Sequence, residues 1–182
     1  MGKTLLLTGH PGIGKTTIIR NVVAQLGNKA GGFYTEEILG PGGRKGFRLI
    51  TLDGKKTAQT VTIAHVDLRD SKAPRVGRYG VDVAALEHVG VAALRRAMQE
   101  KKLVIVDEIG TMELYSRAFC DTVMLAILGS TPVLGTIMSH PHPESDVFKT
   151  LAQVTLWEVN RTTRDDLPGK VMAWLNKNIQ QT

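Results

Sequence analysis

A complete phosphate-binding loop near the start of the chain constrains its fold more than any other feature. The loop is Gly9-His10-Pro11-Gly12-Ile13-Gly14-Lys15-Thr16. The apolar run 4–8 before it is typical of a buried parallel strand, and the run 16–26 after it carries apolar residues at helical spacing. An isolated glycine-rich turn would not need a strand before it and a helix after it. The chain is therefore expected to bind a nucleoside triphosphate.

The residue types in the loop explain how phosphates would be held. Glycines allow consecutive backbone N–H groups to face one concavity, and the anion then lies at the N-terminus of the following helix. Lys15 is predicted to contact the β- and γ-phosphates as a catalytic residue, and the Thr16 hydroxyl to bind Mg²⁺, the expected cofactor. The predicted nucleotide-binding residues of the loop are Gly9, His10, Pro11, Gly12, Ile13, Gly14, Lys15, Thr16 and Thr17.

Two carboxylates supply the second half of the predicted site. Asp107 and Glu108 follow the apolar run 103–106, which is typical of a buried strand. We expect Asp107 to bind Mg²⁺ directly or through a water, as the acidic residue at the end of this strand does in phosphate-loop enzymes. Glu108 should point elsewhere, because strand side chains alternate, and should activate a water in line with the γ-phosphate. This adjacent glutamate favours hydrolysis over transfer to another acceptor.

The remaining pattern predicts an α/β fold. Residues 31–38 and 47–52 are rich in β-branched and aromatic side chains and are joined by Gly40-Pro41-Gly42-Gly43, which indicates a hairpin. Further strands are expected at 60–64, 132–137 and 154–159, and helices at 83–98, 117–128 and from about 168 onward. This alternation predicts a three-layer sandwich with a largely parallel central sheet and an inserted hairpin. The length of 182 residues suits a single domain, 1–182.

Composition and charge limit the partners and the cellular compartment that we expect for this protein. The net charge is +6, but Lys and Arg are scattered, so no nucleic-acid partner is expected. Cys120 is the only cysteine, which excludes an intrachain disulfide and favours a reducing compartment. No apolar run is long enough to span a membrane, and the start of the chain has no signal-peptide pattern. We expect a cytoplasmic protein, with a monomer as the default state.

Four arginines are candidates for contacts with the nucleotide. Arg75 and Arg78 flank a glycine, and one of them could be an internal arginine finger that neutralises charge on the transferred phosphoryl group. A solvated basic loop is the alternative. Arg161 and Arg164 follow the last predicted strand, where a base or ribose would lie, and planar guanidinium groups can stack on any base.

Two further polar features of the sequence are the histidine-containing segment 139–146 and Glu113. The segment 139–146 contains His140 and His142, but its prolines favour an extended, solvated loop over a metal site. Glu113 is expected from its position to orient Glu108 or Thr136 rather than to bind metal.

Several further motifs lie beyond the loop: Gly32-Phe33-Tyr34-Thr35-Glu36-Glu37, Gly46-Phe47, Thr51-Leu52-Asp53-Gly54, Arg75-Val76-Gly77-Arg78-Tyr79, Asp107-Glu108-Ile109-Gly110, Met112-Glu113-Leu114, Gly135-Thr136-Ile137 and the segment 161–164. Through these motifs and the loop, the chain resembles the THEP-type nucleoside-triphosphatase family over nearly its whole length. Thr111 and the segment 139–146 depart from the family pattern. The resemblance implies a P-loop fold of RecA-like or kinase-like type. It also implies Mg²⁺-dependent hydrolysis of ATP, GTP, CTP and UTP to the diphosphate and phosphate, with little base preference.

Two other functions remain open from the sequence. A nucleotide or small-molecule kinase would release phosphate by leakage to water when its acceptor is absent, and the four arginines could bind a phosphorylated second substrate. A nucleic-acid-dependent module of RecA type would need a clustered basic and aromatic stripe, which the sequence lacks.

Overall fold

The computed structural model describes residues 3–53 and 57–179, so Gly54 of one family motif lies outside the described residues. The strands are β1 (Thr4–Gly9), β2 (Ala30–Gly40), β3 (Gly43–Thr51), β4 (Thr60–His65), β5 (Arg75–Val76), β6 (Tyr79–Val81), β7 (Leu103–Ile109), β8 (Val133–Met138) and β9 (Val154–Glu158). They form one sheet with the order β5-β6-β4-β3-β2-β7-β8-β1-β9.

One half of the sheet is parallel. β1 pairs with β8 on one side and β9 on the other, and β7 pairs with β8 and β2, all in parallel. The strand that leads into the phosphate-binding loop is therefore separated by β8 from the strand that carries the two carboxylates. Parallel strands share one carboxyl edge, so both motifs still meet there.

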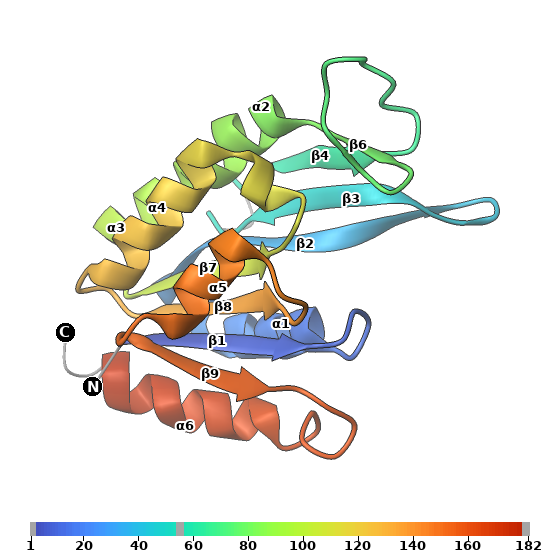
Figure 1. Cartoon of the computed structure of the whole chain (residues 1–182). Helices are drawn as coiled ribbons and strands as arrows, with labels where there is room; N and C mark the ends of the chain where they lie inside the picture. Colours follow the sequence, from blue (N-terminus) through green and yellow to red (C-terminus); the bar gives the residue numbers. More distant parts are fainter. Residues whose placement is uncertain (1–2, 54–56, 180–182) are drawn as a thin grey trace.

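The other half of the sheet is antiparallel and begins with the predicted hairpin. β2 and β3 pair from Phe33 with Thr51 to the turn at Gly40 and Gly43. The same β2 also pairs with β7, so the hairpin continues the main sheet rather than standing apart as an insertion. In Figure 1 the two strands extend beyond the end of the parallel half, on the side where the loop after β1 lies.

Helices cover both faces of the sheet, which confirms the three-layer α/β prediction (Figure 1). The helical segments are α1 (Lys15–Leu26), η1 (Gly27–Lys29), α2 (Val83–Ala85), η2 (Leu86–Val91), α3 (Ala92–Glu100), η3 (Glu113–Tyr115), α4 (Arg117–Leu128), α5 (Pro143–Thr150) and α6 (Leu167–Ile179). Helices α1 and α6 pack on one face through Ile18, Ile19, Val171 and Leu175.

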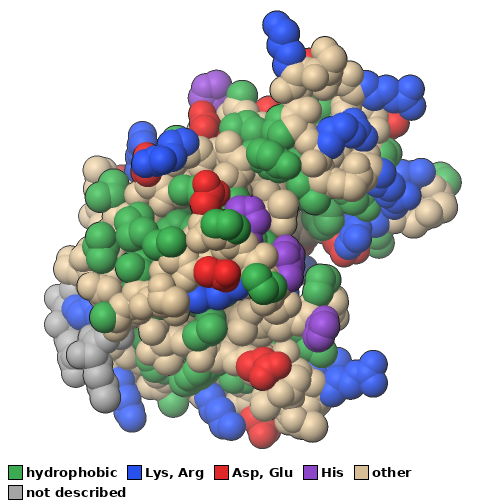
Figure 2. All heavy atoms as spheres, in the orientation of Figure 1, with side chains coloured by type: hydrophobic (Ala, Val, Ile, Leu, Met, Phe, Trp, Pro, Cys, Tyr) green, Lys and Arg blue, Asp and Glu red, His purple; other side chains and the backbone are tan. Residues whose placement is uncertain are grey.

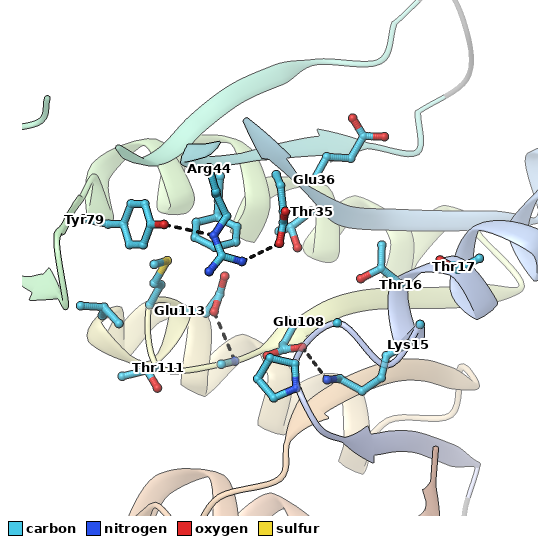
Figure 3. Close-up of a pocket in the computed structure, with 18 of the residues that line it drawn as sticks. Lys15, Thr16, Thr17, Thr35, Glu36, Arg44, Tyr79, Glu108, Thr111 and Glu113 are labelled. Carbon is cyan, nitrogen blue, oxygen red and sulfur yellow. Dashed lines mark hydrogen bonds and ion pairs between the residues drawn. The ribbon is translucent and has the colours of Figure 1, made fainter. Parts of the chain in front are cut away.

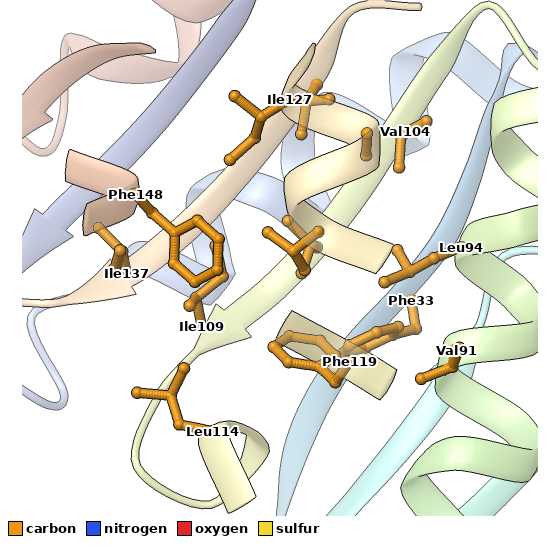
Figure 4. Close-up of a cluster of buried hydrophobic side chains, with 14 of the residues drawn as sticks. Phe33, Val91, Leu94, Val104, Ile109, Leu114, Phe119, Ile127, Ile137 and Phe148 are labelled. Atoms are coloured by element: carbon orange, nitrogen blue, oxygen red, sulfur yellow. The ribbon is translucent and has the colours of Figure 1, made fainter. Parts of the chain in front are cut away.

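The opposite face carries the larger core. Side chains of α3, α4 and α5, including Leu94, Phe119 and Phe148, pack against Phe33 of β2 and Val104 of β7 (Figure 4). Both faces of β7 are thus covered, which is why residues 103–106 form a continuous apolar run rather than an alternating one.

Two details differ from the sequence-based expectations. β7 continues to Ile109, so Asp107 and Glu108 lie inside the strand rather than after it. The prediction of an extended loop over 139–146 is wrong for its second half, because Pro143 begins α5. Proline is well suited to the first turn of a helix, and the His142 side chain caps this one by accepting from the Glu144 N–H. Among the described residues no helix is long and apolar enough to cross a membrane.

Candidate active site

The phosphate-binding loop lies between the end of β1 and the start of α1. Gly14 precedes the helix with φ of 113°, a left-handed conformation that favours glycine. Lys15 is only 6% exposed. Its Nζ donates to the Gly9 carbonyl at 2.9 Å and to the His10 carbonyl at 3.4 Å, so the ammonium lies inside the curve of the loop.

The structure brings Glu108 to this lysine. One Glu108 carboxylate oxygen lies 3.5 Å from Lys15 Nζ, and the Glu108 side chain is about a third exposed. It therefore faces open space beside the loop, where it can contact water. Figure 3 shows the pair with the Thr16 and Thr17 side chains nearby.

Asp107 has the opposite environment. It is fully buried, and one of its oxygens accepts a hydrogen bond from the Thr136 hydroxyl on β8. Burial raises the pKa of the Asp107 carboxyl to about 6, and the charge of Glu108 also raises it. Hydrogen bonds from the Thr136 and Thr16 hydroxyls and from the Thr35 backbone lower this pKa and so offset part of the effect. Its other oxygen, Oδ2, has no hydrogen-bond partner among the described residues.

An orphaned carboxylate oxygen beside the Thr16 hydroxyl fits a hard cation. Mg²⁺ prefers oxygen ligands and is commonly held by one or two protein groups together with phosphate oxygens and waters. Within residues 3–53 and 57–179 there is no cluster of three or more His, Cys, Asp or Glu that could hold a metal alone. The residues present therefore suit an ion that arrives with a nucleotide.

A pocket of about 810 Å³ opens beside the loop. Figure 2 shows the surface hollowed between the end of the parallel half of the sheet and the antiparallel half. The lining side chains come from the loop and α1, from the β2–β3 hairpin and from the segment after β7; they include Lys15, Thr16, Arg20, Thr35, Glu37, Arg44, Phe47, Tyr79, Glu108, Met112 and Glu113. This volume is in the range of small-molecule sites.

Glu113 lies in this pocket but is almost fully buried. Its Oε2 accepts from the Gly110 N–H at 3.2 Å. Burial raises the pKa of the Glu113 carboxyl to about 8, and the nearby Glu108 charge adds to the effect. Such an environment favours the protonated form of Glu113. The predicted role in orienting Glu108 stays a prediction.

The titration of Glu113 should make the stability of the protein depend on pH. Its carboxyl has an ordinary pKa of 4.5 when unfolded and about 8 when folded. Its stabilising contribution is complete below pH 4.5 and is lost as the pH rises through about 8, at up to about 1.4 kcal/mol per pH unit. Glu113→Gln keeps an acceptor for Gly110 but removes the charge. The melting temperature of the variant should therefore rise relative to the native protein between pH 5 and 9.

Thermal melts at several pH values, without nucleotide, test this expectation. Glu100→Gln at the exposed end of α3 is the control, and its difference from the native protein should stay constant. Parallel curves for Glu113→Gln and the native protein would contradict a buried, proton-binding Glu113.

The four candidate arginines separate into two pairs. Arg161 and Arg164 line a second pocket of about 400 Å³ on the other side of the loop, together with His10 and Asn160. Arg75 and Arg78 are absent from the described lining of either pocket. The Arg75 guanidinium donates to the carbonyls of Leu68 and Arg78, and the role of this pair in catalysis stays a prediction.

Sequence reasoning missed Arg44 and Arg20. Both line the large pocket, Arg44 from the hairpin and Arg20 from the second turn of α1. The position of Arg20 could have been found, because it follows Thr16 at helical spacing. No local signal marks Arg44, because its approach to the loop depends on the pairing of β2 with β7.

Comparison with known proteins identifies the family of the chain. A family model described as NTPase matches residues 4–172 of the chain. The chain belongs to this nucleoside-triphosphatase family. The matched residues include the phosphate-binding loop and Asp107-Glu108, which lie at one edge of the sheet.

Relatives and solved structures of the family cover nearly the whole chain. Nucleoside-triphosphatase THEP1 of Thermotoga sp. (strain RQ2) is 41% identical over 174 residues, which is 96% of each protein. The crystal structure of THEP1 from Aquifex aeolicus has a TM-score of 0.84 and 34% identity, over 94% of this chain and 98% of that one. The solution structure of a human cancer-related nucleoside triphosphatase has a TM-score of 0.74 and 32% identity, over 93% and 95%. The predicted family and the P-loop fold are both confirmed.

Proposed function

We propose that this chain hydrolyses ATP, GTP, CTP and UTP to the diphosphate and phosphate, with Mg²⁺ and with little preference for the base. The observation that carries the proposal is the position of Glu108. Its partly exposed carboxylate lies 3.5 Å from Lys15 Nζ and next to the buried Asp107, in a pocket large enough for the reacting phosphate and a water. A carboxylate that faces water beside the γ-phosphate can act as a general base.

Four residues of the site would have separate roles in hydrolysis. Lys15 exchanges the loop carbonyls and Glu108 for β- and γ-phosphate oxygens. Glu108 takes a proton from the water, whose oxygen bonds to the γ-phosphorus while the bond from that phosphorus to the bridging oxygen breaks. Thr16 and Asp107 would hold Mg²⁺, which neutralises charge on the phosphate oxygens when bound.

Broad base tolerance has support in the second pocket. Arg161 and Arg164 lie after β9, across the loop from Glu108, where the nucleoside would extend once its phosphates occupy the loop. Guanidinium planes stack on purines and pyrimidines alike, so they give affinity without selecting a base.

Loss of this arginine pair should weaken binding without slowing the chemical step. Arg161→Ala with Arg164→Ala is expected to raise KM about 30-fold for all four nucleotides, since the two stacking contacts contribute about 1 kcal/mol each. Their kcat values should change little. The exposed Arg117, which pairs with Asp121 on α4, provides the control Arg117→Ala. A large fall in kcat, or a loss for one base alone, would contradict the assignment.

The deciding experiment measures phosphate release from the four nucleotides, with Mg²⁺ and with a chelator, alone and then with a panel of nucleosides, monophosphates and small alcohols. Similar rates that need Mg²⁺ and ignore every acceptor support hydrolysis. Strong stimulation by one acceptor, with transfer of labelled phosphate to it, would make the protein a kinase instead.

The domain organisation, oligomeric state and cellular location of the protein are also part of the proposal. We expect residues 1–182 to act as one domain, as a monomer in the cytoplasm and without nucleic acid. The scattered positive charge and the single cysteine support this view.

A further inference from the structure

Three cationic side chains line the described part of the large pocket, and they differ in how they are held. Lys15 lies inside the loop. Arg20 pairs with Glu36 at 3.1 Å and lies over the ring of Tyr34 at 5.5 Å from its centre. Arg44 comes from the hairpin, on the far side of the pocket from the loop (Figure 3).

The guanidinium of Arg44 is held in place by two neighbours. Its Nη1 donates to a Glu37 carboxylate oxygen at 2.5 Å, and its Nε donates to the Tyr79 hydroxyl at 3.1 Å. It also lies over the ring of Phe47, 5.0 Å from the ring centre. Among the contacts of the described residues Nη2 has no partner, so part of the donor fork remains available.

The strand geometry relates this guanidinium to the end of the pocket where Asp107 lies. Thr35 and Glu37 lie on the same face of β2, separated by two residues or about 6.7 Å. The backbone of Thr35 acts on the Asp107 carboxyl, and the carboxylate of Glu37 contacts Arg44. Arg44 pairs with Leu39 across the hairpin, and its side chain reaches back to Glu37, so its guanidinium lies about one strand repeat along β2 from Thr35, in the pocket that both residues line.

The contact that holds Arg44 is easily exchanged. The side chains of Arg44 and Glu37 are 41% and 52% exposed, and exposed ion pairs of this kind contribute little to stability. A phosphate oxygen can therefore replace the Glu37 carboxylate as the partner of Nη1, while the Tyr79 hydroxyl keeps the side chain directed into the pocket.

We propose that Arg44 is the arginine that contacts the γ-phosphoryl group during hydrolysis and neutralises the charge that develops on it. This inference rests on the proposed function. It assigns to Arg44 the role that the sequence suggested for Arg75 or Arg78. The Arg78 side chain instead donates to the backbone carbonyl of Arg44, so it supports the hairpin at that residue.

The test compares Arg44→Ala and Arg44→Lys with the native protein. Loss of the guanidinium fork should lower kcat about 10²- to 10³-fold with KM nearly unchanged, because the contact forms only as the γ-phosphoryl group transfers. Binding of Mg-ADP with aluminium fluoride, which mimics the transferring phosphoryl group, should fall by a similar factor, while binding of Mg-ADP alone should not. Arg44→Lys should recover little, since Lys lacks the fork.

Arg48→Ala is the matched control, because Arg48 is on the same strand, pairs with Glu36 at 2.8 Å and is outside the described lining of the pocket. It should keep native activity. Glu37→Gln removes the charge of one of the two groups that hold Arg44 but keeps the guanidinium, so its loss of activity should be much smaller than that of Arg44→Ala. Equal losses in Glu37→Gln and Arg44→Ala would show a structural role for the pair and overturn the proposal.

Native rates in Arg44→Ala, with loss in Arg75→Ala or Arg78→Ala, would also overturn it. A melting temperature for each variant separates misfolding from a catalytic defect, and Arg44→Lys keeps the proposal testable if Arg44→Ala unfolds. Failure of the broader hydrolysis proposal would be visible separately, as native phosphate release that does not depend on Glu108.

Discussion

Glu108→Gln is expected to lower phosphate release by about 10²- to 10⁴-fold, the contribution of a general base, while nucleotide affinity stays nearly unchanged. The amide has almost the shape of the carboxylate but cannot take the proton of the attacking water. Steady-state phosphate release gives the rate, and titration with a fluorescent nucleotide gives the affinity. Because the same variant also loses its ion pair with Lys15, a small gain in affinity is consistent with the assignment.

Lys15→Ala distinguishes phosphate binding by Lys15 from proton transfer to Glu108. The lysine is predicted to bind phosphates in the ground state and during transfer, so its loss should weaken binding and lower the rate together. Native activity in Glu108→Gln would contradict the mechanism, whatever Lys15→Ala does. Equal loss of affinity in both variants would show that Glu108 acts by holding the lysine.

Gly32→Ala is expected to cost more than about 3 kcal/mol of folding free energy, because the new methyl group would overlap the backbone of the adjacent strand. A Cβ at Gly32 would lie 2.1 Å from the Ile105 carbonyl oxygen. The backbone at Gly32 also has φ of +102°, which L side chains rarely adopt. Urea denaturation of the variant measures the loss, which should lower the midpoint sharply.

Gly42→Ala separates the two causes. Gly42 in the hairpin turn has φ of +78°, but no atom lies within 4 Å of the position that a methyl group would take there, so the variant carries the backbone strain without the overlap. It should cost about 1 kcal/mol, as an alanine in a left-handed conformation does. Equal destabilisation by the two substitutions would mean that β2 and β7 can separate to admit a methyl group.

The elements that the sequence predicts well are those with a complete local signal. Helix α4 begins at Arg117 and ends at Leu128, the bounds that the apolar spacing indicates. The meeting of the loop around Lys15 with the carboxylates at 107 and 108 is also predictable, because parallel strands share a carboxyl edge whatever their order.

The elements that escape prediction depend on contacts distant in sequence, with one exception. Arg44 enters the pocket because β2 pairs with both β3 and β7, and no pattern within the hairpin contains that information. The unpaired oxygen of Asp107 likewise depends on the depth of burial beside Thr136. Helix α5 is the exception, because Pro143 followed by Glu144 and Asp146 is a recognisable helix start, although the prolines of the segment suggest an extended loop.

The position of β1 in the sheet has a consequence for biosynthesis. β1 pairs only with β8 and β9 within the described residues, although both of these strands follow it at a long distance in the sequence. The β2–β3 and β3–β4 hairpins can form locally and early, whereas β1 must wait for residues 133–138. The phosphate-binding loop therefore takes its final shape only after residues 133–138 have been synthesised, and bound nucleotide can stabilise only chains that extend beyond this strand.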